Sequence, residues 1–455
     1  IALIDSAYVA ARDSDNNFDG GQLTSDSFND EILSFDSSQF IANRNLYPDP
    51  AGFAGRPSIE LIEVSPHGIV VAISEDGEVV RSTDGDSFSP AGYPDSSWDS
   101  MEGRGYKATG LQYGNGVFVV NHTRYSNPSF ARTEFRVSTD GLTWTRAPLT
   151  NVFRNIGGGP SGIFGKPLTY LKGPNVFAAW NSTSQDERFF ITSPDGLTWT
   201  ATGYDRRSDS MFGGAFSDAV SAAVSGGGKT ILVTDAYLDN PPLLYIADDS
   251  DIVNNPGGSD ANWRAVTTPP PRLQDPDETD ENVTSITQAT YGKGQFNLYA
   301  PRGWYVTSTD GDSWSGWQRM GDYTSQFAAG PYGPAFAKYD SGSGSFIVNG
   351  PYISNPRDSA IVMFSDDGNN WVTKDLEELT GGDGWTNTGP PRDAAYDPVR
   401  ARWTIVGEEG HYATATYGRS NRSQKLFWNG DQILTEKDSA IIKDIIDSDH
   451  IESII

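Results

Sequence analysis

A seven-residue phrase that ends in an aromatic residue recurs along this chain, and it restricts the fold more than any other feature. The clear copies are STDGDSF (82–88), STDGLTW (138–144), SPDGLTW (193–199), STDGDSW (308–314) and SDDGNNW (365–371). A degenerate copy, GGSDANW, occupies residues 257–263. The terminal aromatic residues are spaced by 56, 55, 64, 51 and 57 positions. A nearly constant period of this size predicts a repeat protein in which each repeat is one supersecondary unit.

A second landmark, centred on glycine, precedes each phrase. It reads YGNGVF (113–118), KGPNVF (172–177), SGGGKTI (225–231), YGKGQF (291–296) and SGSGSF (341–346), with weaker versions SPHGIV (65–70) and DPVRARW (397–403). Glycine or asparagine between apolar runs is typical of tight hairpins. Each repeat is therefore expected to have four strands; in the second they fall near Thr109–Tyr113, Val117–Asn121, Phe135–Ser138 and Thr143–Ala147. The landmarks predict seven such units.

The residues of the phrase suit a tight turn that packs against a neighbouring sheet. Asp140 can accept backbone N–H groups, Gly141 can take a left-handed conformation, and Ser138 and Thr143 can bridge the turn. Trp144 would bury a large ring between adjacent sheets. The phrase thus has a structural role, predicted for Asp84, Phe88, Asp140, Trp144, Asp195, Trp199, Trp263, Asp310, Trp314, Asp367 and Trp371.

These copies resemble a shortened form of the Asp-box, the repeat of bacterial neuraminidases, over roughly residues 59–430. The resemblance implies an all-β β-propeller whose blades carry the box between their third and fourth strands. We expect seven blades; six is the alternative, because the last unit (393–434) lacks the box. Trp428 follows Trp403 by 25 residues, as Trp371 follows Phe346, and this spacing favours a seventh blade. The 49 glycines, 27 prolines and 12% aromatic residues also favour an all-β chain.

Three parts are expected along the chain: an N-terminal linker or oligomerisation segment (1–58), the propeller (59–434) and a C-terminal helical linker or oligomerisation segment (435–455). Ile1, Ile4 and Tyr8 lie at helical spacing, as do Ile441 and Ile445. Ile-rich seams favour three-stranded association, so a homotrimer is expected. These ends resemble the linker repeats of virion structural proteins and tail fibres of cyanobacterial and other marine phages. The resemblance implies a virion location and other virion proteins as partners.

In an up-and-down meander, the short turns lie on one face and the long, variable connections on the other, which is where binding residues gather. Aromatic and arginine side chains on those connections are the candidate ligand-binding residues: Trp98, Arg104, Arg124, Tyr125, Tyr204, Arg206, Arg207, Trp317, Arg319, Tyr323 and Trp385. Such a mixture suits recognition of a glycan or a protein surface.

The net charge of −27 disfavours nucleic-acid binding, and no apolar run is long enough to insert in a membrane. The chain has no cysteine, and its four histidines are not clustered, so neither a metal nor a cofactor is expected. A sialidase would carry an R-I-P motif before the first box, whereas GRPS (55–58) lacks the isoleucine.

The hypothesis is therefore a phage virion structural protein of the tail-fibre type, whose propeller binds a host-surface glycan or envelope protein. A virion-associated sialidase-like glycosidase and a purely structural tail or capsid decoration subunit are the alternatives. No catalytic residue is assigned, and binding is favoured over catalysis.

Overall fold

A computed structural model describes residues 11–12, 18–19, 41–45, 58–74, 77–92, 106–125, 131–148, 168–180, 190–201, 220–234, 244–254, 263–271, 286–320, 334–349, 361–376, 391–407, 410–415, 427–428 and 433–434. Contacts divide the chain into two units, residues 38–415 and residues 1–37 with 416–455. The larger unit contains the repeats.

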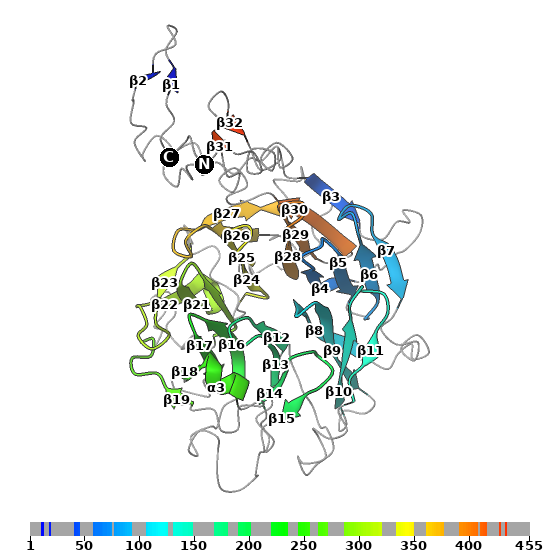
Figure 1. The fold of residues 1–455 in the computed structure, drawn as a ribbon, viewed down its shortest axis with the longest axis horizontal. Coiled ribbons are helices and arrows are strands. Elements are labelled where there is room, and N and C mark those ends of the chain that lie inside the picture. The colour runs from blue at the N-terminus through cyan, green and yellow to red at the C-terminus, as the bar shows by residue number, and fades with distance from the viewer. Residues whose placement is uncertain are drawn as a thin grey trace, which may run out of the picture. The chain divides into compact units, whose positions relative to one another are not determined.

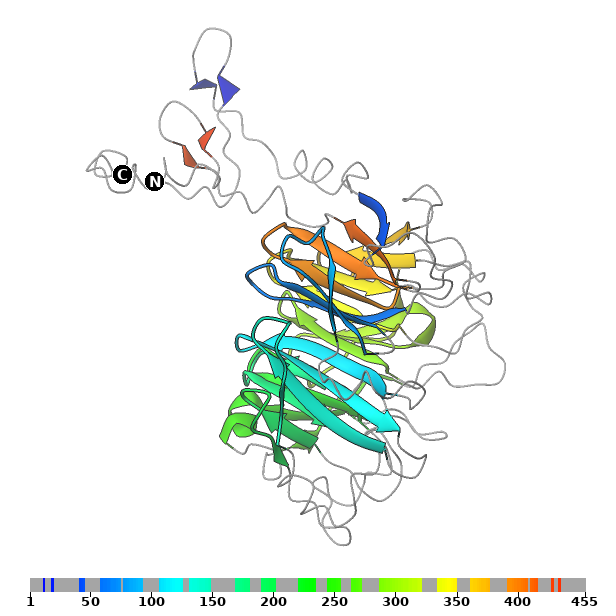
Figure 2. The same ribbon diagram turned by 90° about the vertical axis from the view of Figure 1, so that its right-hand side faces the viewer.

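Seven four-stranded antiparallel sheets form a ring in this unit, which confirms the all-β, seven-bladed propeller (Figure 1). Figure 2 shows the blades edge-on. The strands are, in blade 1, β4 (Ile59–Val64), β5 (Val70–Ser74), β6 (Val79–Ser82) and β7 (Ser89–Gly92); in blade 2, β8 (Tyr106–Gly114), β9 (Val117–Tyr125), β10 (Ala131–Ser138) and β11 (Thr145–Arg146); in blade 3, β12 (Leu168–Leu171), β13 (Val176–Trp180), β14 (Phe190–Ser193) and β15 (Thr200–Ala201); in blade 4, β16 (Val220–Gly226), β17 (Lys229–Thr234), β18 (Leu244–Asp248) and β19 (Arg264–Ala265); in blade 5, β20 (Gln288–Gly292), β21 (Gln295–Tyr299), β22 (Trp304–Ser308) and β23 (Gln318–Arg319); in blade 6, β24 (Ala337–Asp340), β25 (Ser345–Asn349), β26 (Ile361–Ser365) and β27 (Val372–Asp375); and in blade 7, β28 (Asp393–Asp397), β29 (Arg402–Val406), β30 (His411–Ala415) and β3 (Ile41–Asn45). The described helices are short: α3 (Asp249–Asn254) follows β18, and a 3-10 turn, η3 (Pro301–Gly303), precedes β22.

The fourth strand of blade 7 comes from the other end of the repeat array. Strand β3 pairs antiparallel with β30, with Ile41 opposite Thr414 and Asn45 opposite His411. The expectation that the outer strand of this blade lies near Trp428 is wrong, because β31 (Phe427–Trp428) pairs with β32 (Ile433–Leu434) in a separate two-stranded sheet. The ring thus extends beyond residues 59–434 at its N-terminal side, since it includes residues that the sequence assigned to a linker.

The middle strands of each blade read as continuous apolar runs because both of their faces are covered by neighbouring blades. In blade 1 all five residues of β5 are buried, and in blade 6 all residues of β25 and β26 are buried. The core is therefore a circle of apolar layers between blades. One such layer joins Val119 and Phe135 of blade 2 to Phe177 and Ile191 of blade 3.

The Ser-x-Asp-Gly turns are closed by hydrogen bonds within a few residues. In blade 2, Asp140 Oδ1 accepts the N–H groups of Leu142 and Thr143, both at 2.8 Å, and the Ser138 hydroxyl at 3.0 Å. The N–H of Gly141 donates to Ser138 Oγ at 2.8 Å. Gly141 has φ +73°, and a Cβ there would lie 2.5 Å from Val71 of blade 1, so the position needs glycine for conformation and for space.

The same bonds hold the carboxylates in their charged form. The N–H groups of Ser87 and Asp86 lower the pKa of Asp84, those of Ser313 and Asp312 lower the pKa of Asp310, and Thr143 does the same for Asp140. A carboxylate that accepts several backbone N–H groups loses them on protonation, so each turn favours the ionised acid.

The aromatic residue after each turn packs on the preceding blade. Trp199 of blade 3 stacks on Phe135 of blade 2, with ring centroids 4.1 Å apart. Trp371 of blade 6 meets Tyr299 and Tyr305 of blade 5 edge-on at 6.0 Å. The relation continues where the ring closes, since Phe88 of blade 1 contacts Tyr412 of blade 7 at 5.2 Å. The repeated aromatic residues therefore join neighbouring sheets.

In the smaller unit, β1 (Ala11–Arg12) pairs with β2 (Phe18–Asp19). The helices expected around residues 1–8 and 441–446 lie outside the described residues. Among the residues that the structure describes, no helix combines the length and the apolar character needed to span a membrane.

Candidate functional site: the central channel

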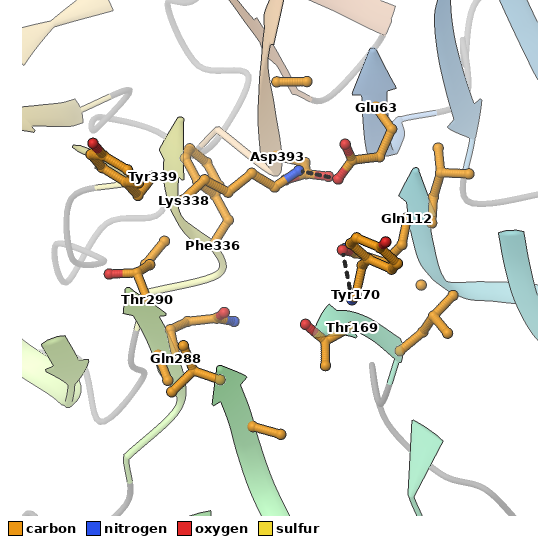
Figure 3. Close-up of a pocket in the computed structure, with 18 of the residues that line it drawn as sticks. Glu63, Gln112, Thr169, Tyr170, Gln288, Thr290, Phe336, Lys338, Tyr339 and Asp393 are labelled. Atoms are coloured by element: carbon orange, nitrogen blue, oxygen red, sulfur yellow. Dashed lines mark hydrogen bonds and ion pairs between the residues drawn. The ribbon is translucent and has the colours of Figure 1, made fainter. Parts of the chain in front are cut away.

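The innermost strands of the blades enclose a cavity of about 1150 Å³ along the axis of the ring (Figure 3). Each repeat contributes one equivalent position of its innermost strand to this wall. In most blades this position directly precedes a tyrosine at the start of the first hairpin. It is occupied in blades 1 to 7 by Glu63, Gln112, Thr169, Val224, Thr290, Lys338 and Ala395. This position contributes one side chain per blade to the wall, and in five of the seven blades that side chain is polar.

The side chain of Lys338 in blade 6 extends past blade 7 and contacts blade 1. Its Nζ lies 3.0 Å from Glu63 Oε1 and 3.0 Å from Asp393 Oδ1, and it donates to the Ile62 carbonyl at 3.2 Å (Figure 3). Asp393 of blade 7 also accepts the Ile62 N–H at 2.9 Å through Oδ2. This cluster connects blades 6, 7 and 1, which include the two ends of the repeat array.

The charges of this cluster depend on one another. Burial raises the pKa of Glu63, and the Lys338 ammonium opposes that rise. Burial would lower the pKa of Lys338, but Asp393 and Glu63 outweigh burial and raise it. The lysine therefore stays protonated at neutral pH and is already occupied by two carboxylates. A second ion pair joins Arg392, which directly precedes β28, to Glu60 of β4 at 3.7 Å.

Five tyrosines surround the hairpin end of the channel, and each contacts an aromatic ring of its own blade in an edge-on or tilted arrangement. The pairs are Tyr113–Phe118, Tyr170–Phe177, Tyr291–Phe296, Tyr339–Phe346 and Tyr396–Trp403, at 4.6 to 5.5 Å. Four of them also cover a glycine of the preceding blade. A Cβ at Gly226 would lie 2.0 Å from the ring of Tyr291, and one at Gly292 would lie 2.4 Å from Tyr339. Burial raises the pKa of Tyr396 to about 12, so this phenol stays neutral at pH 7.

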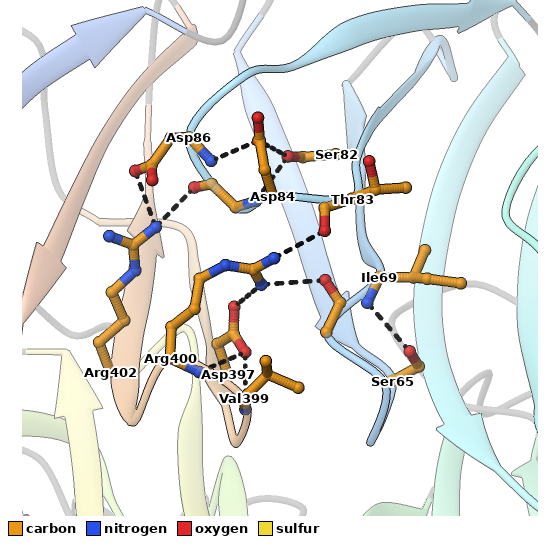
Figure 4. Close-up of polar contacts among 12 residues, drawn as sticks. Ser65, Ile69, Ser82, Thr83, Asp84, Asp86, Asp397, Val399, Arg400 and Arg402 are labelled. Atoms are coloured by element: carbon orange, nitrogen blue, oxygen red, sulfur yellow. Dashed lines mark hydrogen bonds and ion pairs between the residues drawn. The ribbon is translucent and has the colours of Figure 1, made fainter. Parts of the chain in front are cut away.

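On the same face, two arginines of blade 7 hold the turn of blade 1 (Figure 4). Arg400 pairs with Asp397 and donates to the carbonyls of Gly68 at 3.0 Å and Thr83 at 2.7 Å. Arg402 donates to the Gly85 carbonyl at 2.9 Å and to Asp86 at 2.8 Å. The first-hairpin turn and the Ser-x-Asp-Gly turn therefore share one face, as an up-and-down meander requires.

The residues predicted to bind ligand on the opposite face are only partly described. Trp98, Arg104, Tyr204, Arg206, Arg207, Tyr323 and Trp385 lie outside the described residues, and Arg124 and Tyr125 end strand β9. Trp317 and Arg319 each contact another residue of blade 5 or of the segment before it. Trp317 Nε1 donates to the Pro271 carbonyl at 2.6 Å, and the Arg319 guanidinium lies 4.6 Å from the ring centroid of Trp304. Their role in binding stays a prediction.

The channel residues were not singled out from the sequence. A signal for them exists, because the polar residue before the tyrosine recurs in QYG (112–114), TYL (169–171), TYG (290–292) and KYD (338–340). Its meaning depends on knowing which strand is innermost. Within the described residues no group of three or more metal-ligating side chains occurs.

No protein-family model matches the chain, and no curated protein matches it. Among solved structures, the chain is similar to YCF48 bound to D1 peptide, with 11% identity and a TM-score of 0.49 over 86% of this chain and 99% of that one. It is similar to YCF48 from Cyanidioschyzon merolae, with 13% identity and a TM-score of 0.47 over 82% and 99% of the two chains. It is also similar to the computationally designed Ika8 protein, with 9% identity and a TM-score of 0.40 over 80% and 98%.

Proposed function

We propose that this chain is a binding protein of a phage virion, of the tail-fibre type, whose propeller attaches to a host-surface glycan or envelope protein through its loop face. By loop face we mean the side of the ring opposite the hydrogen-bonded turns. The observation that carries the proposal is the contrast between the two sides. Turns on one side are short and repeat nearly unchanged, whereas connections on the other, such as residues 93–105, 149–167 and 202–219, are long and differ in sequence.

The turn chemistry supports assigning the repeats to the Asp-box type. In four blades the Ser-x-Asp-Gly turn is closed by the same bond, in which the glycine N–H donates to the serine Oγ at 2.8 to 2.9 Å. The Ile-rich ends support assembly into a homotrimer and contact with other virion proteins, because apolar stripes of this length are not stable alone in water.

The channel favours binding over glycoside hydrolysis. Glycosidases require two carboxylates with separate acid and base or nucleophile roles. Here Glu63 and Asp393 both contact Lys338, and Asp393 also accepts two backbone N–H groups, from Ile62 and Ala394 at 2.9 Å. Arg392 is the single arginine among the described residues of the wall, whereas a sialidase resemblance implies an arginine triad.

A direct test is the binding of the intact, fluorescently labelled chain to a glycan array and to cyanobacterial cells. The triple variant Tyr204→Ala, Arg206→Ala, Arg207→Ala removes polar and aromatic groups from one long connection. It is expected to lower binding at least about tenfold, since a few aromatic and arginine contacts dominate most interfaces.

Leu142→Ala is the matched control, because Leu142 is 50% exposed on the side of the short turns. It should leave binding unchanged. Absence of binding to every array glycan and to the cells by a trimeric sample would reject the attachment role and favour a purely structural decoration subunit. Release of free sugar from the array would instead favour a glycosidase.

A further inference from the structure

The wall of the channel combines unused hydrogen-bonding groups with balanced charge. The side-chain hydroxyl of Thr169 has no hydrogen-bond partner among the described residues, and Gln288 donates its amide N–H to the Ala335 carbonyl at 2.9 Å, which leaves its oxygen available. Gln112 accepts the Tyr170 N–H through Oε1 at 3.3 Å and keeps its NH₂ group. Figure 3 shows these side chains converging on the cavity from blades 2, 3 and 5.

A buried hydroxyl on the same wall lacks a partner. Thr109 is 6% exposed, and its Oγ1 makes no hydrogen bond within the described part of the chain. Thr287 Oγ1, directly before the first strand of blade 5, is also buried without a hydrogen-bond partner. A buried hydroxyl without a partner destabilises a fold by about 1–3 kcal/mol. Because these two oxygens have no exposed surface, this cost falls on the fold, and the polar groups open to the cavity are those of Thr169, Gln112 and Gln288.

The charges of the channel wall favour an uncharged ligand over an ionic one. Although the chain carries a net charge of −27, the wall contains three acidic residues, Glu63, Asp340 and Asp393, and three basic ones, Lys172, Lys338 and Arg392. Lys338 is paired with two of these carboxylates, and Arg392 with Glu60. An ion entering the channel would gain little attraction and would lose its hydration, so an uncharged ligand is favoured.

We propose that the central channel is a binding site for a neutral sugar. A sugar presents hydroxyls that both donate and accept, which suits the hydroxyl of Thr169 and the amides of Gln112 and Gln288. Its C–H faces suit the apolar wall, which includes Leu61 and Phe336. The cavity of about 1150 Å³ exceeds the range of about 300–1,000 Å³ typical of small-molecule sites, so it has room for a mono- or disaccharide.

The test uses the intact chain with glucose, galactose, mannose, N-acetylglucosamine, maltose, cellobiose and lactose, measured by saturation-transfer NMR and calorimetry. Glucuronate and glucosamine serve as charged comparators. At least one neutral sugar is expected to bind with a Kd of about 1 mM or tighter, and the charged analogues about tenfold more weakly. Thr169→Val, which keeps the side-chain shape, should weaken that sugar about fivefold to tenfold.

Thr109→Val adds a second readout. It should leave the Kd of that sugar unchanged, since the Thr109 oxygen has no surface open to the cavity. It should leave or raise the melting temperature of the free protein, because it removes an unpaired buried hydroxyl. Thr373→Val, at an exposed position of β27, should change neither quantity.

The proposal is overturned if no neutral sugar binds more tightly than about 10 mM, if glucuronate binds as tightly as the neutral sugars, or if Thr169→Val keeps the original Kd. The triple variant of residues 204, 206 and 207 should bind the sugar normally. A failure of this channel site is thus separable from a failure of the loop face.

Discussion

The indole of Trp199 stacks on the ring of Phe135, with centroids 4.1 Å apart and planes inclined by 29°, and this contact joins blade 3 to blade 2. Trp199 is 6% exposed, so Trp199→Ala would leave a cavity between two sheets. The free energy of unfolding should fall by about 3–5 kcal/mol, measured by urea denaturation. Leu142→Ala, in the equivalent turn of blade 2 but 50% exposed, should change it by less than about 0.5 kcal/mol. Equal losses of unfolding free energy in the two variants would contradict a stabilising role for the contact between Trp199 and Phe135.

Tyr291 leaves no room for a side chain at Gly226, since a Cβ there would lie 2.0 Å from the ring. Gly226→Ala should therefore force blades 4 and 5 apart and lower the melting temperature by several degrees, corresponding to about 1–3 kcal/mol. Gly316→Ala is the matched control, because nothing lies within 4 Å of a Cβ at that position. If Tyr291→Ala in the Gly226→Ala background brings no recovery, the clash is not the cause.

Lys338 holds two carboxylates of the channel wall, so its loss leaves like charges facing each other. Lys338→Met should destabilise the protein by about 2–4 kcal/mol at pH 7, close to the cost of breaking a buried ion pair. Lys229→Met breaks an ion pair with Asp248 in which the side chains are 39% and 53% exposed, and it should cost less than about 1 kcal/mol. Thermal unfolding at low and high salt compares the two. Similar losses for both lysines would argue against a special role for the channel cluster.

The pair of Asp312 and Arg264 predicts a pH dependence. Arg264 donates to both carboxylate oxygens, at 2.8 and 3.0 Å, and this hydrogen-bonded contact lowers the pKa of Asp312 from 3.8 to about 2. A lowered pKa in the folded state contributes stability above pH 3.8, and this contribution is lost as the pH falls toward 2. Because Arg264 is 52% exposed, the contribution should be below about 1 kcal/mol.

The melting temperature of the wild type should therefore exceed that of Asp312→Asn at pH 6, and the difference should disappear near pH 2. A difference that stays constant over this range would exclude the linkage.

Closure of the ring by β3 predicts different effects for two truncations. Deleting residues 1–37 removes part of the smaller unit and should leave the melting temperature of the propeller within about 2 °C. Deleting residues 1–45 also removes the strand paired with β30, and each lost backbone hydrogen bond should cost about 0.5–1.5 kcal/mol. Far-UV circular dichroism melts compare the two. The role of β3 would be refuted by equal stability of both proteins.

Much of the propeller was predictable because its determinants are local. The bonds of Ser138, Asp140 and Gly141 span at most three residues, so the turn is readable from the letters of the phrase. The seven glycine-centred landmarks then indicated the number of blades, and the strands around Val117 and Phe135 fell where alternation and hairpins placed them. The aromatic residue after the turn had to be buried, and in the ring it packs against the preceding blade as well as against its own.

Tertiary structure alone decided how the ring closes and what its centre presents. Asp393 and Ile62 are 331 positions apart, yet they share a hydrogen bond of 2.9 Å, and Lys338 joins them from a third blade. No local pattern distinguishes β3 from a linker, because a strand that completes another repeat needs only a free edge to pair with. Local hydrogen bonds and periodic burial therefore specify each blade from its own residues, whereas the closing strand and the channel wall arise when blades distant in sequence become neighbours.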